Sequence, residues 1–323
     1  MSVLNVSDLS VKYTTRSGRL RAVNQVSFTI EQGTTLGIVG ESGSGKSQLA
    51  MAIMGLLDDQ ARVSGKVLFE GQSLLELSNS QRRNINGNQI AMVFQDPMSS
   101  LNPYLSIATQ MTEVLVTHKR INYKTALRLA IKLLIDCGIS DAEQRIHSYP
   151  HQFSGGMRQR ILIATALLCQ PSLLIADEPT TALDVSMQAQ ILSLIKQLQR
   201  QQGITLMVIT HDFGVVAELC DQVMVLYGGQ VMEYGQVSTV LQQPKHPYTQ
   251  GLLASMPTLK KTGQQLYSMP GDPPDPVDLP RGCPFEPRCS KRILECQSTK
   301  SEQVLLKDGR QVFCHIVDNF RQV

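Results

Sequence analysis

Residues 36–47 read LGIVGESGSGKS, a short apolar run followed by a glycine-rich segment that ends in Lys46 and Ser47. The apolar run predicts a buried strand, and the next residues, SQLAMAIMGLL at 47–57, are typical of an apolar helix. The segment between them, GESGSGKS, fits the pattern G-x-x-x-x-G-K-[ST] of a phosphate-binding loop. The glycines allow the backbone to wrap closely around phosphate oxygens. Because a strand precedes the loop and a helix follows it, we predict a nucleotide site here.

Each residue of this loop is a candidate for contact with ATP. Lys46 is expected to place its charge at the β- and γ-phosphates, and the Ser47 hydroxyl is expected to ligate Mg²⁺. The predicted contact residues are Gly40, Glu41, Ser42, Gly43, Ser44, Gly45, Lys46 and Ser47.

Two acidic residues end a second apolar run. Residues 172–184, SLLIADEPTTALD, begin like a central strand that is buried on both faces of a parallel sheet. Asp177 is expected to hold the metal through its water shell, and Glu178 to polarise the water that attacks the γ-phosphate. Neighbouring acids at a strand end are more often simply solvated. After a phosphate loop, however, they predict a catalytic pair.

Two further polar residues follow strand-like segments. His211 ends ITLMVITH at 204–211, and Gln95 ends IAMVFQ at 90–95. Open α/β sheets bind ligands at the carboxyl ends of their strands, so both side chains are predicted near the phosphates. A glutamine can offer an oxygen to Mg²⁺ or orient a water. A lone histidine is more often structural or exposed.

A second glycine pair occurs in YPHQFSGGMRQR, residues 149–160, at the predicted start of a helix. Unpaired N–H groups in the first turn of a helix form a potential anion site. One chain therefore carries two potential phosphate sites.

These segments together resemble the ATP-binding subunits of ABC transporters. GESGSGKS resembles the Walker A motif, FQDP the Q-loop, FSGGMRQR the signature motif, LLIADE Walker B, ALD at 182–184 the D-loop, and ITHD the switch histidine. The resemblance spans about residues 4–235. It implies an α/β fold of the P-loop NTPase type, with a parallel-sheet core, an antiparallel β subdomain and a helical subdomain at about residues 100–165. We expect this nucleotide-binding domain to occupy residues 1–240.

The resemblance also implies that two such domains pair head to tail. Ser154, Gly155 and Gly156 would then contact the γ-phosphate held on the partner chain, and Asp184 of the D-loop would lie near the same nucleotide. Tyr13 matches the aromatic residue that stacks on adenine in this family, although a tyrosine in a strand is more often a packing residue. Met157 stands where glutamine is commonest, and activity is expected to survive this difference.

Residues 241–323 form a predicted extension with four of the seven cysteines. HPYTQGLL and GCPFEPRC resemble the carboxyl-terminal extension of the oligopeptide and dipeptide importer ATPases, nearest to the oligopeptide type. The cysteine spacing is not that of a zinc finger, and disulfides are disfavoured in a reducing cytoplasm. Gathered thiolates suggest an iron–sulfur cluster or zinc, and free thiols are the alternative. The resemblance favours a [4Fe-4S] cluster, while His315 keeps zinc open; the four candidate ligands are Cys283, Cys289, Cys296 and Cys314.

Composition excludes some other classes of protein. The chain has 323 residues, 42% of them hydrophobic, and a net charge of +3, which is too mild to indicate nucleic-acid binding. Neither a secretory signal nor a membrane-spanning run is evident in the sequence, so we expect a cytoplasmic protein.

The resemblance implies a subunit that hydrolyses ATP to drive oligopeptide import at the cytoplasmic face of the bacterial inner membrane, as a peripheral protein. Its expected partners are a second ABC ATPase, two transmembrane permease subunits and, indirectly, an extracytoplasmic peptide-binding protein. The second ATPase is expected to be a related chain, although an identical copy is possible. Another cargo, such as dipeptides, nickel or glutathione, stays open. A non-transport ABC ATPase would usually show two ATPase domains or a long coiled coil, and a phosphate-loop kinase would not need SGGMRQR.

Overall fold

The computed structural model describes residues 1–16, 18–181, 184–256 and 268–318. It divides into two compact units. Unit 1 comprises Met1–Leu4, Ile30–Thr35 and Phe69–Ile209, and unit 2 comprises Asn5–Thr29, Leu36–Leu68 and Thr210–Val323. The boundary expected near residue 240 falls inside unit 2, so the extension belongs to the same compact unit as the phosphate loop.

Unit 1 contains three parallel strands in the order β6-β7-β8. All five residues of β7 and all six of β8 are buried, as their continuous apolar runs predict. Its strands are β5 (Gln72–Ser73), β6 (Ile90–Val93), β7 (Leu173–Asp177) and β8 (Thr205–Thr210). Its helices are α2 (Asn79–Ile85), α3 (Pro97–Ser100), α4 (Ile107–Lys119), α5 (Tyr123–Asp136), α6 (Ala142–Arg145), the 3-10 turn Pro150–Gln152, α7 (Gly155–Leu167) and α8 (Val185–Gln202).

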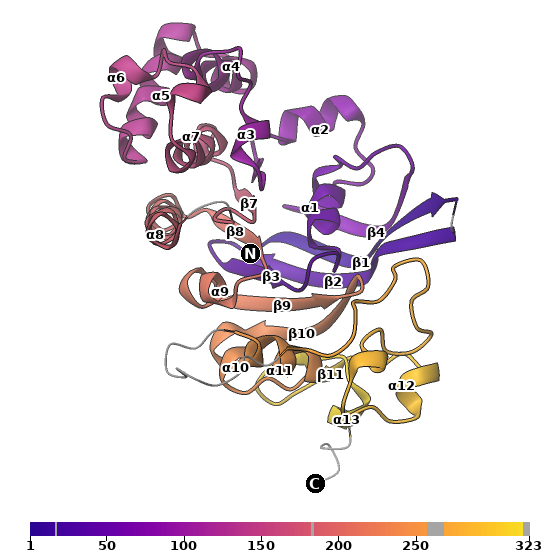
Figure 1. Cartoon of the computed structure of the whole chain (residues 1–323). Coiled ribbons are helices and arrows are strands. Elements are labelled where there is room, and N and C mark those ends of the chain that lie inside the picture. Colours follow the sequence, from indigo (N-terminus) through magenta and orange to yellow (C-terminus); the bar gives the residue numbers. More distant parts are fainter. Residues whose placement is uncertain (17, 182–183, 257–267, 319–323) are drawn as a thin grey trace. The chain divides into compact units, whose positions relative to one another are not determined.

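The helical part of unit 1 groups α4, α5, α6 and α7 (Figure 1). Its α5 is the helix expected from the apolar spacing of residues 124–139, and it buries Ala126, Ala130 and Leu134, which share one face at intervals of four residues. The Asn122 side chain caps this helix by accepting from the Thr125 N–H at 2.9 Å. The cap and the apolar face therefore both favour a helix over these residues.

Unit 2 contains five strands of mixed direction in the order β11-β12-β10-β9-β3, and β3 is parallel to β9. A second sheet has the order β2-β1-β4. The strands are β1 (Ser2–Thr15), β2 (Gly18–Glu31), β3 (Thr35–Val39), β4 (Ala61–Phe69), β9 (Gln222–Tyr227), β10 (Gln230–Gln236), β11 (Val304–Leu305) and β12 (Gln311–Val312). The helices are α1 (Lys46–Met54), α9 (Phe213–Leu219), α10 (Val237–Gln242), α11 (Pro247–Ala254), the 3-10 turn Glu286–Arg288, α12 (Glu295–Ser298) and α13 (His315–Asp318).

The carboxyl-terminal extension is part of the core of unit 2. One cluster of buried side chains joins Val39 of β3 and Val225 of β9 to Tyr248, Phe285 and Cys296 of the extension. In Figure 1, α10 and α11 lie beside β10, and the predicted turn at Gly228–Gly229 joins β9 to β10. Removing the extension would therefore expose apolar surface behind the strand that leads into the phosphate loop.

A buried ion pair fastens the start of the extension to β10. Glu233 is fully buried, and its carboxylate accepts from the backbone N–H groups of Lys245 and His246 at 3.0 Å each. Arg310 lies 3.5 Å from the same carboxylate. Burial raises the pKa of Glu233, and the hydrogen bonds and the Arg310 charge act in the opposite direction.

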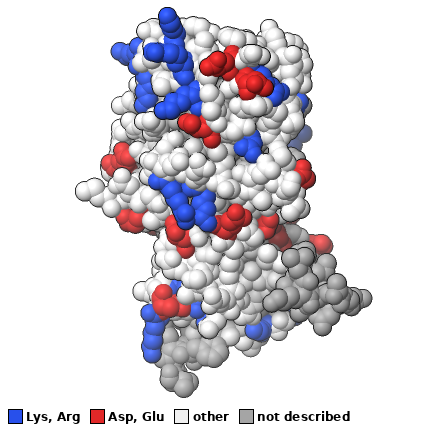
Figure 2. All heavy atoms as spheres, turned by 90° about the vertical axis from the view of Figure 1, so that its left-hand side faces the viewer, with Lys and Arg blue, Asp and Glu red and all other residues white. Residues whose placement is uncertain are grey.

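Charged side chains of both signs lie interspersed on the face that Figure 2 shows, and uncharged residues form most of it. No helix in the described part of the chain is long and apolar enough to cross a membrane.

Candidate nucleotide site

The phosphate loop follows β3 without a break and leads into α1. All five β3 residues are buried, so the loop starts from a fixed point. A Cβ at Gly40 would lie 2.2 Å from the Leu226 carbonyl oxygen, and one at Gly45 would lie 2.2 Å from the Ala22 carbonyl oxygen. Gly45 also has a φ of +98°, a left-handed value that favours glycine. Both glycines are therefore required by close backbone contacts.

Lys46 is largely buried and its ammonium group bonds to the loop itself. It donates to the Gly40 and Glu41 carbonyl oxygens, each at 2.8 Å. The backbone of Ser44 also accepts a hydrogen bond, at 3.0 Å, from the Gly229 N–H of the β9–β10 turn. The expected contact residues Ser42 and Gly43 are exposed in the turn between β3 and α1, and Ser47 is the second residue of α1.

Tyr13 lies on β1 in the same unit, and its hydroxyl donates to Gln48 Oε1 of α1 at 2.6 Å. Burial, and after it the charge of Asp58, raises the pKa of this phenol. The ring is only partly buried. Gln48 was not predicted from the sequence, and it fixes the tyrosine relative to the helix that begins with Lys46.

The two acids predicted to act on ATP lie at the end of β7 in unit 1. Asp177 is buried, and Glu178 has a φ of +47°, an unusual value for a residue with a side chain. The Glu178 carboxylate oxygen Oε2 accepts from Gln95 Nε2 at 3.2 Å and from Thr181 Oγ1 at 2.7 Å. The structure therefore brings the predicted pair Gln95 and Glu178 together, and adds Thr181, which sequence reasoning missed.

The second glycine pair begins α7, as predicted. Ser154 is the N-cap of this helix, and its hydroxyl accepts from the Met157 N–H at 3.4 Å. Ser154 and Gly155 are exposed, whereas Gly156 is buried, and a Cβ there would overlap the Met187 side chain of α8. The exposed part of the pair therefore presents a hydroxyl and the amino end of a 13-residue helix.

Comparison with known proteins identifies the family. Residues 23–181 match the ABC transporter family, and residues 232–296 match the carboxyl-terminal region of oligopeptide/dipeptide transporters. The oligopeptide transport ATP-binding protein OppD of Haemophilus influenzae is 50% identical over 91% of each chain, and the dipeptide transport ATP-binding protein DppD of Bacillus subtilis is 47% identical over 98% of this chain and 95% of its own. The chain belongs to the ABC transporter ATP-binding proteins of the oligopeptide and dipeptide type.

A solved structure agrees with this assignment. The dimeric structure of MJ0796, a bacterial ABC transporter cassette, covers 72% of this chain and 98% of its own, with a TM-score of 0.65 and 27% identity. The predicted ABC-type α/β fold is confirmed, and the chain is the ATP-hydrolysing subunit of a transporter.

The structure describes one residue of the D-loop, Asp184, and it describes the switch histidine, His211. Ala182 and Leu183 of the D-loop lie outside the described residues. Asp184 is the N-cap of α8 and accepts from the Met187 N–H at 2.9 Å, which, with a hydrogen bond from Ser186, lowers the pKa of this carboxyl. His211 directly follows β8 and is exposed. Their roles at the nucleotide stay predictions.

The four cysteines of the extension line one small cavity together with Phe285 and His246. Its volume is about 10 Å³, room for a single water molecule. Burial raises the pKa of Cys283 to about 12 and also raises the pKa values of Cys289 and Cys314. Within the described ranges, no three His, Cys, Asp or Glu side chains are arranged to hold a metal ion. The donor set matches a sulfur-ligated metal, but the cavity would have to widen to admit one.

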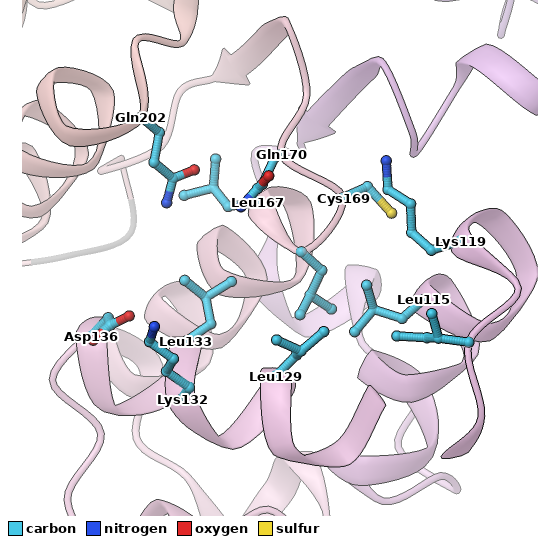
Figure 3. A pocket seen from close by; sticks show the side chains of 12 residues that line it. Leu115, Lys119, Leu129, Lys132, Leu133, Asp136, Leu167, Cys169, Gln170 and Gln202 are labelled. Atoms are coloured by element: carbon cyan, nitrogen blue, oxygen red, sulfur yellow. The ribbon is translucent and has the colours of Figure 1, made fainter. Parts of the chain in front are cut away.

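A larger cavity of about 380 Å³ lies in the helical part of unit 1 (Figure 3). Leu115, Leu129 and Leu133 form part of its apolar wall, and Lys119 and Lys132 lie at its edge. Its lining residues come from α4, α5 and the chain between them, from the end of α7 and the residues that follow it, and from the last residue of α8. None of them belongs to an ATP-binding motif. Cavity size alone would therefore point away from the nucleotide site.

Sequence reasoning missed two residues that contact the Walker A loop. Tyr248 accepts a hydrogen bond from the Glu41 N–H, and Arg288 forms an ion pair with the Glu41 carboxylate. Both occur inside the motifs HPYTQGLL and GCPFEPRC, but their sequence distance from residue 41 gives no sign of the contact.

Gly40→Ala tests whether backbone contact is the reason for the first Walker A glycine. The new Cβ would meet the Leu226 carbonyl oxygen, and neither backbone segment can yield easily, so we expect a loss of about 2 kcal/mol in stability. Thermal unfolding of the full chain measures the change. Gly155→Ala is the matched control, because its Cβ would meet nothing within 4 Å. Equal melting temperatures of the two variants would contradict the explanation.

Proposed function

We propose that this chain powers the import of oligopeptides across the cytoplasmic membrane by binding and hydrolysing ATP. The observation that carries the proposal is the pair of features in one chain: a Walker A loop held by close backbone contacts, and a carboxyl-terminal region matching oligopeptide/dipeptide transporters. Relatives named for oligopeptide transport are 48–50% identical to the chain, and relatives named for dipeptide transport are 45–47% identical. Dipeptides, nickel or glutathione are the alternative cargoes.

Each side chain of the proposed site has its own role in ATP hydrolysis. Lys46 and the loop N–H groups bind the β- and γ-phosphates. Ser47, Gln95 and Asp177 offer a hydroxyl, an amide oxygen and a carboxylate, which are the oxygen donors that Mg²⁺ prefers. When bound, Mg²⁺ neutralises charge that develops on the phosphate oxygens. Glu178 accepts a proton from the attacking water, and Gln95 and Thr181 hold its carboxylate in place.

Glu178→Gln tests the base. The amide keeps the shape of the carboxylate and one oxygen that can accept from Gln95 and Thr181, but it cannot accept the proton, so we expect ATP hydrolysis to fall about 100-fold or more while nucleotide binding is retained. Phosphate release and fluorescent-nucleotide binding measure the two quantities. Glu76→Gln, which changes an exposed carboxylate elsewhere in unit 1, serves as the control. A variant that hydrolyses ATP at the wild-type rate would remove Glu178 from this role.

Turnover is proposed to require a head-to-tail pair of nucleotide-binding domains. Ser154 and Gly155 are exposed at the start of α7, where a hydroxyl and helix N–H groups can grip the γ-phosphate of ATP bound to the partner. The relative MJ0796 cassette has a dimeric structure. The partner of this chain is proposed to be a related ATPase, with an identical copy as the alternative. Each domain would then complete the site of the other.

Ser154→Arg separates the two halves of that site. A long cation at the N-cap would fill the space of the γ-phosphate, so we expect hydrolysis to be lost while the isolated chain binds ATP with unchanged affinity. Ser80→Arg, at an exposed position of α2, is the control for adding a cation. Loss of nucleotide binding by the Ser154 variant would contradict a site completed by the partner.

The remaining partners follow from the transport role. Two transmembrane permease subunits would form the path, and an extracytoplasmic peptide-binding protein would deliver the cargo to them. The chain is then a peripheral protein at the cytoplasmic face of the bacterial inner membrane. The mild net charge of +3 gives no support to nucleic acid as a partner.

Cys283, Cys289, Cys296 and Cys314 are proposed to hold a [4Fe-4S] cluster, with zinc as the alternative and free thiols as the third possibility. The support is chemical: four soft sulfur donors line a single cavity. His315 lines the same cavity and would suit zinc.

Elemental analysis of anaerobically purified full-length protein tests the metal. We expect iron at about four atoms per chain with broad absorbance near the visible edge, both lost in Cys289→Ala. Cys169→Ala in unit 1 is the matched control and should retain the iron. One zinc per chain would favour the alternative metal, and absence of both metals would leave free thiols.

A further inference from the structure

The carboxyl-terminal extension engages the backbone N–H and the carboxylate of Glu41, the second residue of the Walker A loop. Its N–H donates to the Tyr248 hydroxyl at 3.0 Å. Its carboxylate accepts from Arg288 Nη1 at 2.7 Å and from Nη2 at 3.2 Å, a two-pronged ion pair. Its carbonyl accepts from Lys46 at 2.8 Å, so the peptide is held from within the loop as well.

Contacts with Pro270 and Tyr227 hold the Arg288 side chain in place. Its Nε donates to the Pro270 carbonyl at 3.0 Å, and Nη1 also donates to the Tyr227 hydroxyl at 3.2 Å. Its side chain is only 6% exposed, and its guanidinium lies 5.8 Å from the centre of the Tyr227 ring. Burial alone would lower the pKa of Arg288, but its bonds to Glu41 and Tyr227 raise it. A side chain held this firmly determines where the Glu41 carboxylate lies.

Aromatic packing holds Tyr248 in the same way. Its ring is fully buried and lies 4.5 Å from the ring of Tyr227 and 5.3 Å from the ring of Phe285, centre to centre. The Tyr248 N–H donates to His246 Nδ1 at 3.0 Å, which caps α11. The hydroxyl therefore cannot follow the loop if the loop moves.

The Glu41 carboxylate lies in a phosphate-binding loop, and Arg288 neutralises its charge. The loop binds a polyanion, and a carboxylate on its second residue would repel the phosphates. The Glu41 side chain is only 24% exposed, so water screens its charge incompletely. A guanidinium at 2.7 Å neutralises that charge without occupying the loop.

We propose that Tyr248 and Arg288 of the carboxyl-terminal extension are positioning residues of the nucleotide site, which fix Glu41 and neutralise its charge so that the Walker A loop accepts a triphosphate. The inference rests on the proposed ATP-binding role and gives the extension a part in it. Neither residue touches the nucleotide; both act through Glu41.

The test measures the affinity of the full-length chain for a fluorescent ATP analogue. Arg288→Met should weaken binding about tenfold, because it leaves the partly buried Glu41 carboxylate in the phosphate-binding loop without its charge partner. Adding Glu41→Gln to that variant should recover most of the loss, since the repelling charge is gone. Raising the salt concentration should shrink the deficit of Arg288→Met relative to the wild type. A purely structural role for Arg288 would produce neither recovery nor salt dependence.

Arg292→Met is the matched control. Arg292 pairs with Glu286 at 3.4 Å in the same segment, and 56% of its side chain is exposed. It should bind nucleotide like the wild type. If Arg288→Met fails to fold, Arg288→Lys and Tyr248→Phe take its place, with expected losses of about threefold each.

Besides a loss that neither Glu41→Gln nor salt reduces, two results would overturn the inference. One is unchanged affinity in Arg288→Met or in its two substitutes. The other is a loss in Arg292→Met as large as that in Arg288→Met. Failure of the wild type to bind nucleotide would overturn the proposed function as well, so the two failures are distinguishable.

Discussion

A loop that wraps a triphosphate must leave most of its backbone N–H groups open, and this constraint removes many of the contacts that could hold the loop in shape. The restraint comes instead from neighbouring segments of unit 2. Gly40 and Gly45 lie against the carbonyl groups of Leu226 and Ala22, and Gly229 donates to Ser44. Since these contacts are made with backbone atoms, they tolerate no added Cβ at the two glycines. The loop is therefore a product of its surroundings as much as of its own sequence.

The same logic of restraint applies to the acids of unit 1. Glu178 has a left-handed backbone, which costs energy for a residue with a side chain. Gln95 and Thr181 both donate to one oxygen of its carboxylate. A base at this position, the role proposed for Glu178, would need little reorganisation when a water approaches, because both donors already hold its carboxylate.

Much of this site could be predicted because its motifs are local. The strand before the Walker A loop, the helix after it, the turn at Gly228–Gly229 and α5 each follow from a short apolar pattern with its own cap or turn. The contacts of Glu41 could not be predicted, because Tyr248 and Arg288 lie 207 and 247 residues away, and only packing of the extension brings them close. Thr181 was missed for another reason: a threonine after two acids has no distinctive pattern. The periodicity of apolar residues predicts the helices and strands, whereas long-range polar contacts form only when the core is assembled.

The extension looks like an appendage in the sequence, with its prolines and clustered cysteines, yet the core of unit 2 includes it. Phe285 packs on Tyr227 and Tyr248 and also lines the thiol cavity, so one ring separates the four cysteines from the side chains that hold Glu41. Arg288 directly precedes Cys289 in the chain. A displacement of Phe285 or of the chain at Arg288 and Cys289 would therefore change both the thiol cavity and the contacts that hold Glu41. Because close-packed interiors transmit such displacements, the cavity and the Walker A loop are linked through these side chains.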